Sequence, residues 1–177
     1  MRVPLQFGLM YYELFAQKKK MLGQLAKWLD TAAAHAKEKS FDPNVFLTLR
    51  LVADQFPFVR QVQTACDTAK LGASRLTGKE APSHADNEQT LDALRERIQS
   101  TIAYLDGLTA KDFAGADTRV VTQPRWEGKV MSGAHYFAEH VVPNFYFHLA
   151  HAYAILRSNG VNVGKRDYLG TLSLRAP

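Results

Sequence analysis

The sequence predicts an all-α protein with a four-helix bundle, and three observations lead to this prediction. Four stretches carry apolar residues at three-to-four spacing, which is typical of helices that bury one face. The length of 177 residues suits one domain with its own core. An apolar content of 46% with 22% charged residues excludes a wholly disordered or fibrous chain. We therefore expect residues 1–177 to form a single helical domain.

The first two helices are expected over residues 9–39 and 43–77. Asp42 can cap the second helix because its side chain can accept a free backbone N–H. Pro57 lies inside the second helix and removes a backbone hydrogen bond, so this helix should kink or break near residues 54–56. The apolar stripe of the first helix consists of Leu14, Met21, Leu22, Leu25, Trp28, Leu29 and Ala32.

The third and fourth helices are expected over residues 86–106 and 132–158. Asp86 and Gln89 have the spacing of an N-terminal capping box, and Gly107 is a good stop. The third stripe contains Leu91, Leu94, Ile98, Ile102 and Leu105, and the fourth contains Phe137, Val141, Phe145, Leu149, Tyr153 and Leu156.

Two further segments do not follow the helical pattern. Residues 118–131 predict a small β-hairpin or extended excursion between the third and fourth helices. The tail, residues 161–177, is too polar and glycine-rich for another bundle helix, and we expect it to lie over the bundle. Pro143 interrupts the fourth helix.

Cysteine usage and hydropathy indicate a cytoplasmic protein. Cys66 is the only cysteine, which excludes an internal disulfide and a multi-cysteine zinc site and fits a reducing compartment. The N-terminus has no signal-peptide pattern. No apolar run approaches the roughly 20 residues that cross a bilayer as a helix. We therefore expect no membrane partner.

The net charge of +5 does not by itself predict a nucleic-acid partner. The basic residues are scattered, and the densest cluster, residues 18–20, occupies three consecutive helical positions that point in different directions. We expect this cluster to be a solvated face and expect no nucleic acid to bind.

Polar residues on the second and fourth helices are the best site candidates. Asn144 and His148 are four residues apart and share one helix face. Asp54 and Gln61 are seven residues apart, which also returns them to one face. These four residues could meet in a pocket between the helices. Alternatively, His148 is a core histidine with its hydrogen bonds satisfied, Gln61 is hydrogen-bonded, and Asp54 solvates the break at Pro57.

Aromatic residues are concentrated in residues 10–15 and 144–148. They alternate around the helix instead of occupying one stripe, which suggests a homodimer surface or an apolar pocket. Ordinary core packing is the alternative.

Four segments carry a resemblance that covers most of the chain: residues 21–25, 53–63, 143–148 and 159–170. They resemble the DinB/YfiT-like helical-bundle superfamily, in particular its uncharacterised branch, domain of unknown function nineteen-ninety-three. The resemblance implies four helices in up-down-down-up order and frequent dimers. It also implies a divalent metal, held by one histidine on the second helix and a His-x-x-x-His pair on the last, and some members are thiol-dependent transferases or isomerases.

This sequence departs from that metal pattern. The pair on the last helix is Asn144-x-x-x-His148, and the second helix has no histidine. Because an amide is a poor neutral ligand, we favour a protein that binds a small molecule or a partner near Asp54, Gln61, Asn144 and His148. One alternative is a transferase or hydrolase that holds Zn²⁺ or Ni²⁺ with Asp54, Asn144 and His148. Another is a non-catalytic dimeric scaffold, and the sequence does not decide whether the protein is an enzyme.

Overall fold

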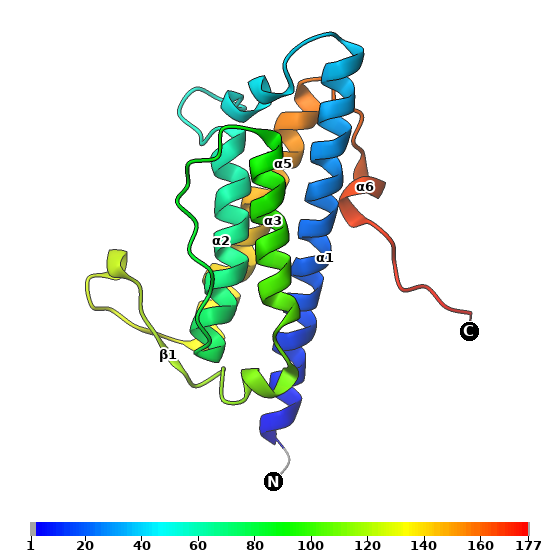
Figure 1. Cartoon of the computed structure of the whole chain (residues 1–177). Helices are drawn as coiled ribbons and strands as arrows, with labels where there is room; N and C mark the ends of the chain where they lie inside the picture. The colour runs from blue at the N-terminus through cyan, green and yellow to red at the C-terminus, as the bar shows by residue number, and fades with distance from the viewer. Residues whose placement is uncertain (1–2, 177) are drawn as a thin grey trace.

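Four long helices run side by side in the computed structural model, which describes residues 3–176 (Figure 1). They are α1 (Val3–Glu38), α2 (Phe58–Thr77), α3 (Leu91–Asp106) and α5 (Val142–Ser158). Helices α1 and α5 run in one direction and α2 and α3 in the other, which confirms the up-down-down-up bundle. Each helix packs on two neighbours, in the order α1, α3, α2, α5 around the bundle.

Shorter elements connect and cover these helices. They are η1 (Pro43–Thr48), η2 (Ala110–Phe113), β1 (Val120–Val121), η3 (Pro124–Trp126), β2 (Met131–Ser132), α4 (Gly133–His135), η4 (Tyr136–Val141) and α6 (Lys165–Leu169). Strands β1 and β2 pair antiparallel, which confirms the hairpin predicted between the third and fourth helices.

The second helix is shorter than predicted. The expected helix over residues 43–77 is wrong in its first half, because only η1 is helical there and α2 begins at Phe58. Pro57 has an extended backbone (φ −68°, ψ 165°) and offers no N–H, so it stands directly before the first turn of α2. Asp42 does act as a cap, since its carboxylate accepts a bond from the backbone N–H of Asn44 at 2.9 Å, but the helix it caps is η1.

The third helix also begins later than predicted, at Leu91 instead of residue 86. Thr90 is its cap, with Oγ1 accepting the N–H of Ala93 at 3.0 Å. Asp86 instead has a left-handed backbone (φ 55°), and its carboxylate binds Arg97. Residues 78–90 therefore return along the bundle in irregular form, and this crossover makes α2 and α3 parallel (Figure 1).

The fourth helix, predicted over residues 132–158, is one helical run in three parts. It starts as α4, widens to a π-helical turn in η4 and continues as α5. Pro143 lies in the first turn of α5 and does not break the run, because the missing N–H falls where the π turn meets the α-helix. The π-helical turn contains His140.

The core is continuous, and the C-terminal tail packs against its outside. The expectation that the tail lies over the bundle is confirmed for its first part, where α6 contacts α1. Residues 171–176 are exposed and extend away from the helices (Figure 1), and residue 177 lies outside the described residues. The indole Nε1 of Trp28 donates to the carbonyl of Asp167 at 3.2 Å, and the Tyr168 ring stacks on the indole at 5.6 Å. The side chains with no exposed surface include Leu22, Leu25, Leu29, Phe58, Val62, Leu94, Ile98, Phe145 and Leu149. Each contributes about 1.5–3 kcal/mol through burial.

The expectation of a solvated face at residues 18–20 is wrong for Lys18, which is 1% exposed. Its ammonium lies 4.6–5.8 Å from the centres of four rings, a cation–π arrangement. Burial lowers the pKa of this amine to about 8. The four rings belong to Phe15, Phe137, Phe145 and Tyr146.

Candidate functional site

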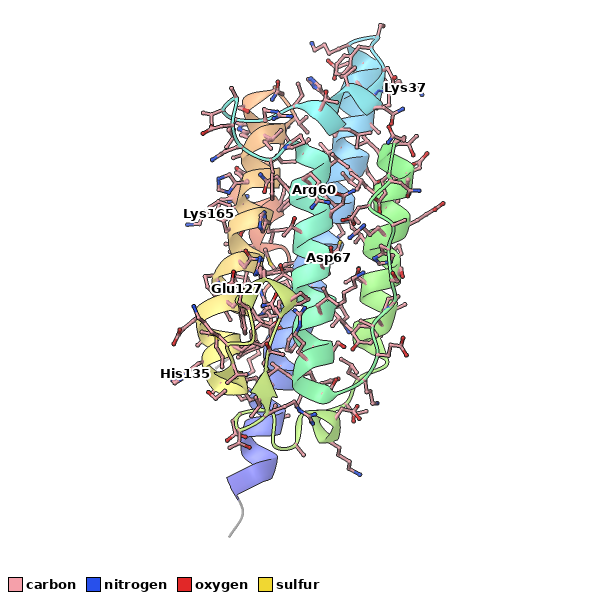
Figure 2. The ribbon with its side chains drawn as sticks, turned by 90° about the vertical axis from the view of Figure 1, so that its left-hand side faces the viewer. Lys37, Arg60, Asp67, Glu127, His135 and Lys165 are labelled. Atoms are coloured by element: carbon pink, nitrogen blue, oxygen red, sulfur yellow. The ribbon has the colours of Figure 1, made fainter. Side chains whose placement is uncertain are left out.

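A polar stripe follows the contact between α2 and the η4–α5 run, and we call it the α2–α5 seam. Figure 2 shows α2 between α5 on one side and α3 on the other. Steps of three, four or seven residues place each set of side chains along one face of its helix. The seam consists of Gln61, Thr64, Thr68 and Arg75 from α2 and Tyr136, His140, Asn144 and His148 from η4 and α5.

His148 and Gln61 form a closed pair at one end of the seam. The Nδ1–H of His148 donates to Oε1 of Gln61 at 2.7 Å, and Nε2 of Gln61 donates to the carbonyl of Phe56 at 3.0 Å. Burial, assisted by His151 and Arg60, lowers the pKa of His148 to about 4. His148 is therefore neutral at pH 7, and the satisfied core histidine is the interpretation that this geometry favours.

Asn144 lies in the middle of the seam and binds α2 through Thr68. Its Nδ2 donates to Oγ1 of Thr68 at 2.7 Å, and that hydroxyl donates to the carbonyl of Thr64 at 2.7 Å. The chain of bonds fixes the Asn144 side chain and leaves its Oδ1 as an acceptor.

The structure does not bring Asp54 to the other three predicted residues. Asp54 is exposed in the irregular segment before α2, and it does not line the hollow that Asn144 and His148 share. Residues 3–176 contain no group of three or more His, Cys, Asp or Glu side chains that could hold a metal ion. Without Asp54, the amide of Asn144 and the neutral imidazole of His148 neutralise no charge, so the predicted donor set does not fit a divalent metal.

Two neighbouring spaces lie along the seam beyond His148. An outer hollow of about 350 Å³ is lined by His148, Asn144, Phe147, Pro143, Glu139 and His140. An inner cavity of about 130 Å³ lies between α2, η4 and the hairpin. Both are lined by His140 and Asn144, so these two residues border both spaces.

The inner cavity is lined by cations and hydrogen-bond donors. Nη1 of Arg75 donates to the hydroxyl of Tyr136 at 2.9 Å, and Nη2 of Arg125 donates to Nε2 of His140. Burial raises the pKa of the Tyr136 phenol against the opposing effect of Arg75. Burial, followed by Arg125 and Arg75, lowers the pKa of His140. Both groups are therefore uncharged at pH 7.

Two buried polar atoms of residues that line the inner cavity have no hydrogen-bond partner within residues 3–176. They are Nδ1 of His140 and Nε2 of Gln123, and the Gln123 side chain is only 8% exposed. A buried polar group without a partner costs about 1–3 kcal/mol, so such groups call for an explanation. The chain keeps two of them around one cavity.

Sequence reasoning found only part of this site. The four-residue spacing of Asn144 and His148 extends back to His140 and Tyr136, and this periodic signal could have predicted the longer stripe. Gln123 and Arg125 come from the hairpin region, where no helical period places them on a face.

The remaining candidates contribute to the core more than to a site. Cys66 is fully buried, and burial raises the pKa of its thiol to about 12, which confirms a structural thiol. Of the two aromatic segments, Tyr11, Phe15 and Phe145 pack in the core, whereas Phe147 is 53% exposed beside the outer hollow.

Comparison with known proteins gives a family but no activity. Residues 10–169 match the domain of unknown function DUF1993. The chain belongs to this family. The crystal structure of a DinB family member from Shewanella denitrificans is 51% identical over 98% of this chain and 99% of that one, with a TM-score of 0.94. This DUF1993 chain is therefore similar to a DinB protein over its whole length, and no curated protein matches it.

Membership of the DUF1993 family agrees with the resemblance recognised in the sequence and with the all-α bundle. No helix in residues 3–176 is long and apolar enough to cross a membrane.

Proposed function

We propose that this DUF1993 protein binds a small molecule in the α2–α5 seam through its own side chains and without a metal triad. The observation that carries the proposal is that His140 and Asn144 line both the outer hollow and the inner cavity. The outer hollow, at about 350 Å³, is within the range of about 300–1,000 Å³ typical of small-molecule sites.

The chemistry of the lining supports the same proposal. Pro143 and Phe147 supply apolar surface in the outer hollow, whereas Asn144 and His148 supply a few fixed polar groups. Such a mixture is typical of ligand sites, in which apolar walls give affinity and polar groups give orientation. The π turn of η4, which carries His140, is also a feature found frequently at functional sites.

A fragment screen followed by amide chemical-shift mapping tests the proposal. We expect binders to shift the backbone amides of Thr68, His140 and Asn144. The variant Asn144→Phe should abolish these shifts, because Asn144 lines both spaces and the larger ring would fill part of them.

The matched control is Ala150→Phe, which adds the same ring to an exposed position of the same helix. It should leave the shifts unchanged. Fragments that bind both variants like the unmodified protein, or that shift only distant amides, would contradict the proposal.

The metalloenzyme alternative makes a different prediction. It requires a divalent ion that depends on His148, although Asp54 is outside the hollow. Elemental analysis of purified protein and of His148→Ala distinguishes the two functions. A stoichiometric metal that disappears in His148→Ala would overturn our preference.

Self-association is a second, compatible proposal. Leu9, Met10 and Leu14 near the start of α1 are 50%, 44% and 37% exposed. We infer that these side chains contribute to a homodimer contact, since exposed apolar clusters mark interaction surfaces. Light scattering of the pair Leu9→Glu and Leu14→Glu tests it. A mass unchanged from that of the unmodified protein would contradict the proposal.

A further inference from the structure

We infer that the inner cavity binds the carboxylate of a small organic acid, while the apolar body of the acid occupies the outer hollow. This inference rests on the proposed function, because it names the chemical class of the ligand for the same seam.

The unpartnered nitrogen of His140 is a donor. A guanidinium carries only donors, so the bond from Arg125 requires Nε2 of His140 to be the acceptor. The ring proton of the neutral imidazole is then on Nδ1, which is the buried atom without a partner. The second unpartnered atom, Nε2 of Gln123, is also a donor.

Tyr136 adds a third donor. Its oxygen accepts from Arg75, so the phenolic hydrogen is free to donate to another group. The residues that line the cavity therefore supply three neutral donor hydrogens that make no hydrogen bond within the described residues. A ligand that supplies acceptors would satisfy all three.

The charges around the cavity also favour an anion. No ion pair of Arg75 or Arg125 occurs within residues 3–176. One carboxylate, that of Asp67, also lines the cavity, but it is paired with Arg97 at 2.7 Å and with Lys70 at 3.1 Å. Two unpaired guanidinium groups and a matched carboxylate leave a net positive lining. Guanidinium groups bind carboxylates especially well, because the two planar groups can share two hydrogen bonds.

The size and the neighbouring surface indicate the rest of the ligand. A cavity of about 130 Å³ holds a carboxylate and little more, and Asn144, which lines it, also lines the outer hollow beside Pro143 and Phe147. Glu139, an exposed acid, also lines that hollow and disfavours a second negative charge there. The ligand class is therefore a monoacid with an apolar or aromatic body.

The test uses 3-phenylpropionate and its neutral analogue 3-phenylpropanol, measured by calorimetry with the full-length protein. The acid should bind at least about tenfold more tightly than the alcohol, since hydrogen bonds to a charged group are worth about 1.5–3 kcal/mol. The acid should also shift the imidazole NMR signal of His140, which His140→Phe assigns by removing it.

Three variants locate the carboxylate. Arg75→Gln should weaken binding of the acid by about tenfold to a hundredfold and leave the alcohol unaffected. Arg157→Gln removes an equal charge from an exposed position of α5 outside both spaces and should change neither affinity. Gln123→Leu should raise the melting temperature without ligand and weaken binding of the acid, a combination that a purely structural role would not produce.

The outcomes separate this inference from the proposed function. Equal affinities of acid and alcohol, both lost in Asn144→Phe, would overturn the carboxylate site and leave the small-molecule site standing. An acid that binds Arg75→Gln and Gln123→Leu as tightly as the unmodified protein would also overturn it. If neither probe binds and the fragment screen yields no binder sensitive to Asn144→Phe, both proposals fail. Melting curves of all variants show that each one is folded.

Discussion

Helix α2 has polar side chains on two sides, and the two sides are balanced differently. Toward α3, Asp67 of α2 joins a network around the buried Arg97, whose guanidinium binds Asp67 and Asp86 at 2.7 Å and Glu88 at 2.9 Å. Toward α5, the guanidinium groups of Arg75 and Arg125 bind only neutral partners.

The difference in charge balance indicates which side of α2 has a structural role. Burial opposes the charge on Arg97, but its bonds to Glu88, Asp67 and Asp86 outweigh burial and raise its pKa. Burial likewise acts against the charged forms of Asp86 and Glu88, but their bonds to Arg97 lower both pKa values. Only Nε of Arg97 lacks a partner in this network. The α3 side therefore supplies its own counter-charges, whereas the α5 side has spare donors.

The largest expected effect is on the α3 side. Arg97→Met should lower the free energy of unfolding by about 3–5 kcal/mol, because it leaves three carboxylates around a buried position without their shared cation. Urea unfolding measures this loss. Arg95→Met, which removes an arginine from pairs with the exposed Asp30 and Asp92, should cost no more than about 1 kcal/mol. Similar losses in the two variants would contradict the contrast.

The next largest effect is a loss of stability at low pH, which depends on His148 on the α5 side. Because the pKa of His148 is depressed from 6.5 to about 4, the unfolded chain binds a proton at this residue before the folded chain does. Its contribution to stability is present above pH 6.5 and is lost as the pH falls toward 4. A shift of this size corresponds to at most about 3 kcal/mol.

The measurement is the pH dependence of unfolding for the unmodified protein and for His148→Gln. The difference between the two curves should change between pH 6.5 and 4 and be flat above pH 7. His135→Gln, at an exposed position of α4, should follow the unmodified protein. A difference curve that is flat throughout would refute the assignment of His148 as a neutral buried group.

A smaller effect, of opposite sign, is expected at Gln123. Gln123→Leu should stabilise the protein by about 1 kcal/mol in the absence of ligand, because it removes a buried donor that has no partner. Thermal unfolding measures the change. On the α3 side, Gln63→Leu should destabilise, since the Gln63 amide donates to Glu88 at 2.6 Å. Changes in stability of the same sign for Gln123→Leu and Gln63→Leu would contradict the difference between the two sides of α2.

The smallest effect is expected at Thr68. Thr68→Val keeps the shape of the side chain and removes the acceptor for Asn144, and it should cost about 0.5–1 kcal/mol. The loss stays small because Asn144 lines the outer hollow, where water can replace the hydroxyl. A loss above about 2 kcal/mol, measured by urea unfolding, would show that this part of the seam is closed to water.

The sequence predicted the architecture well, because helix periodicity survives errors at the helix ends. It also predicted that Gln61 and His148 would share the space between the second and last helices, since each lies on the inward face of a regular helix. The prediction failed for Asp54. Two residues seven apart share one helix face only if the helix is continuous between them, and α2 begins after Pro57, so Asp54 lies outside the helix.

Helical periodicity could not predict the part of the site that comes from the hairpin region. Gln123 and Arg125 come from an irregular segment, whose position depends on tertiary packing and not on local spacing. The charge on Arg97 was equally hard to place, because its partners Asp86 and Glu88 lie in the crossover that was predicted to be the start of a helix.

The reactivity of the buried Lys18 amine can report how often the bundle opens. With a pKa near 8, a fraction of this amine is uncharged and nucleophilic at neutral pH, yet the surrounding rings leave no room for a reagent. Acylation of Lys18 therefore requires separation of α1 from α5, whereas Lys19 and Lys20 are more accessible. The ratio of the acylation rate of Lys18 to the rates of Lys19 and Lys20 would thus measure how often α1 separates from α5.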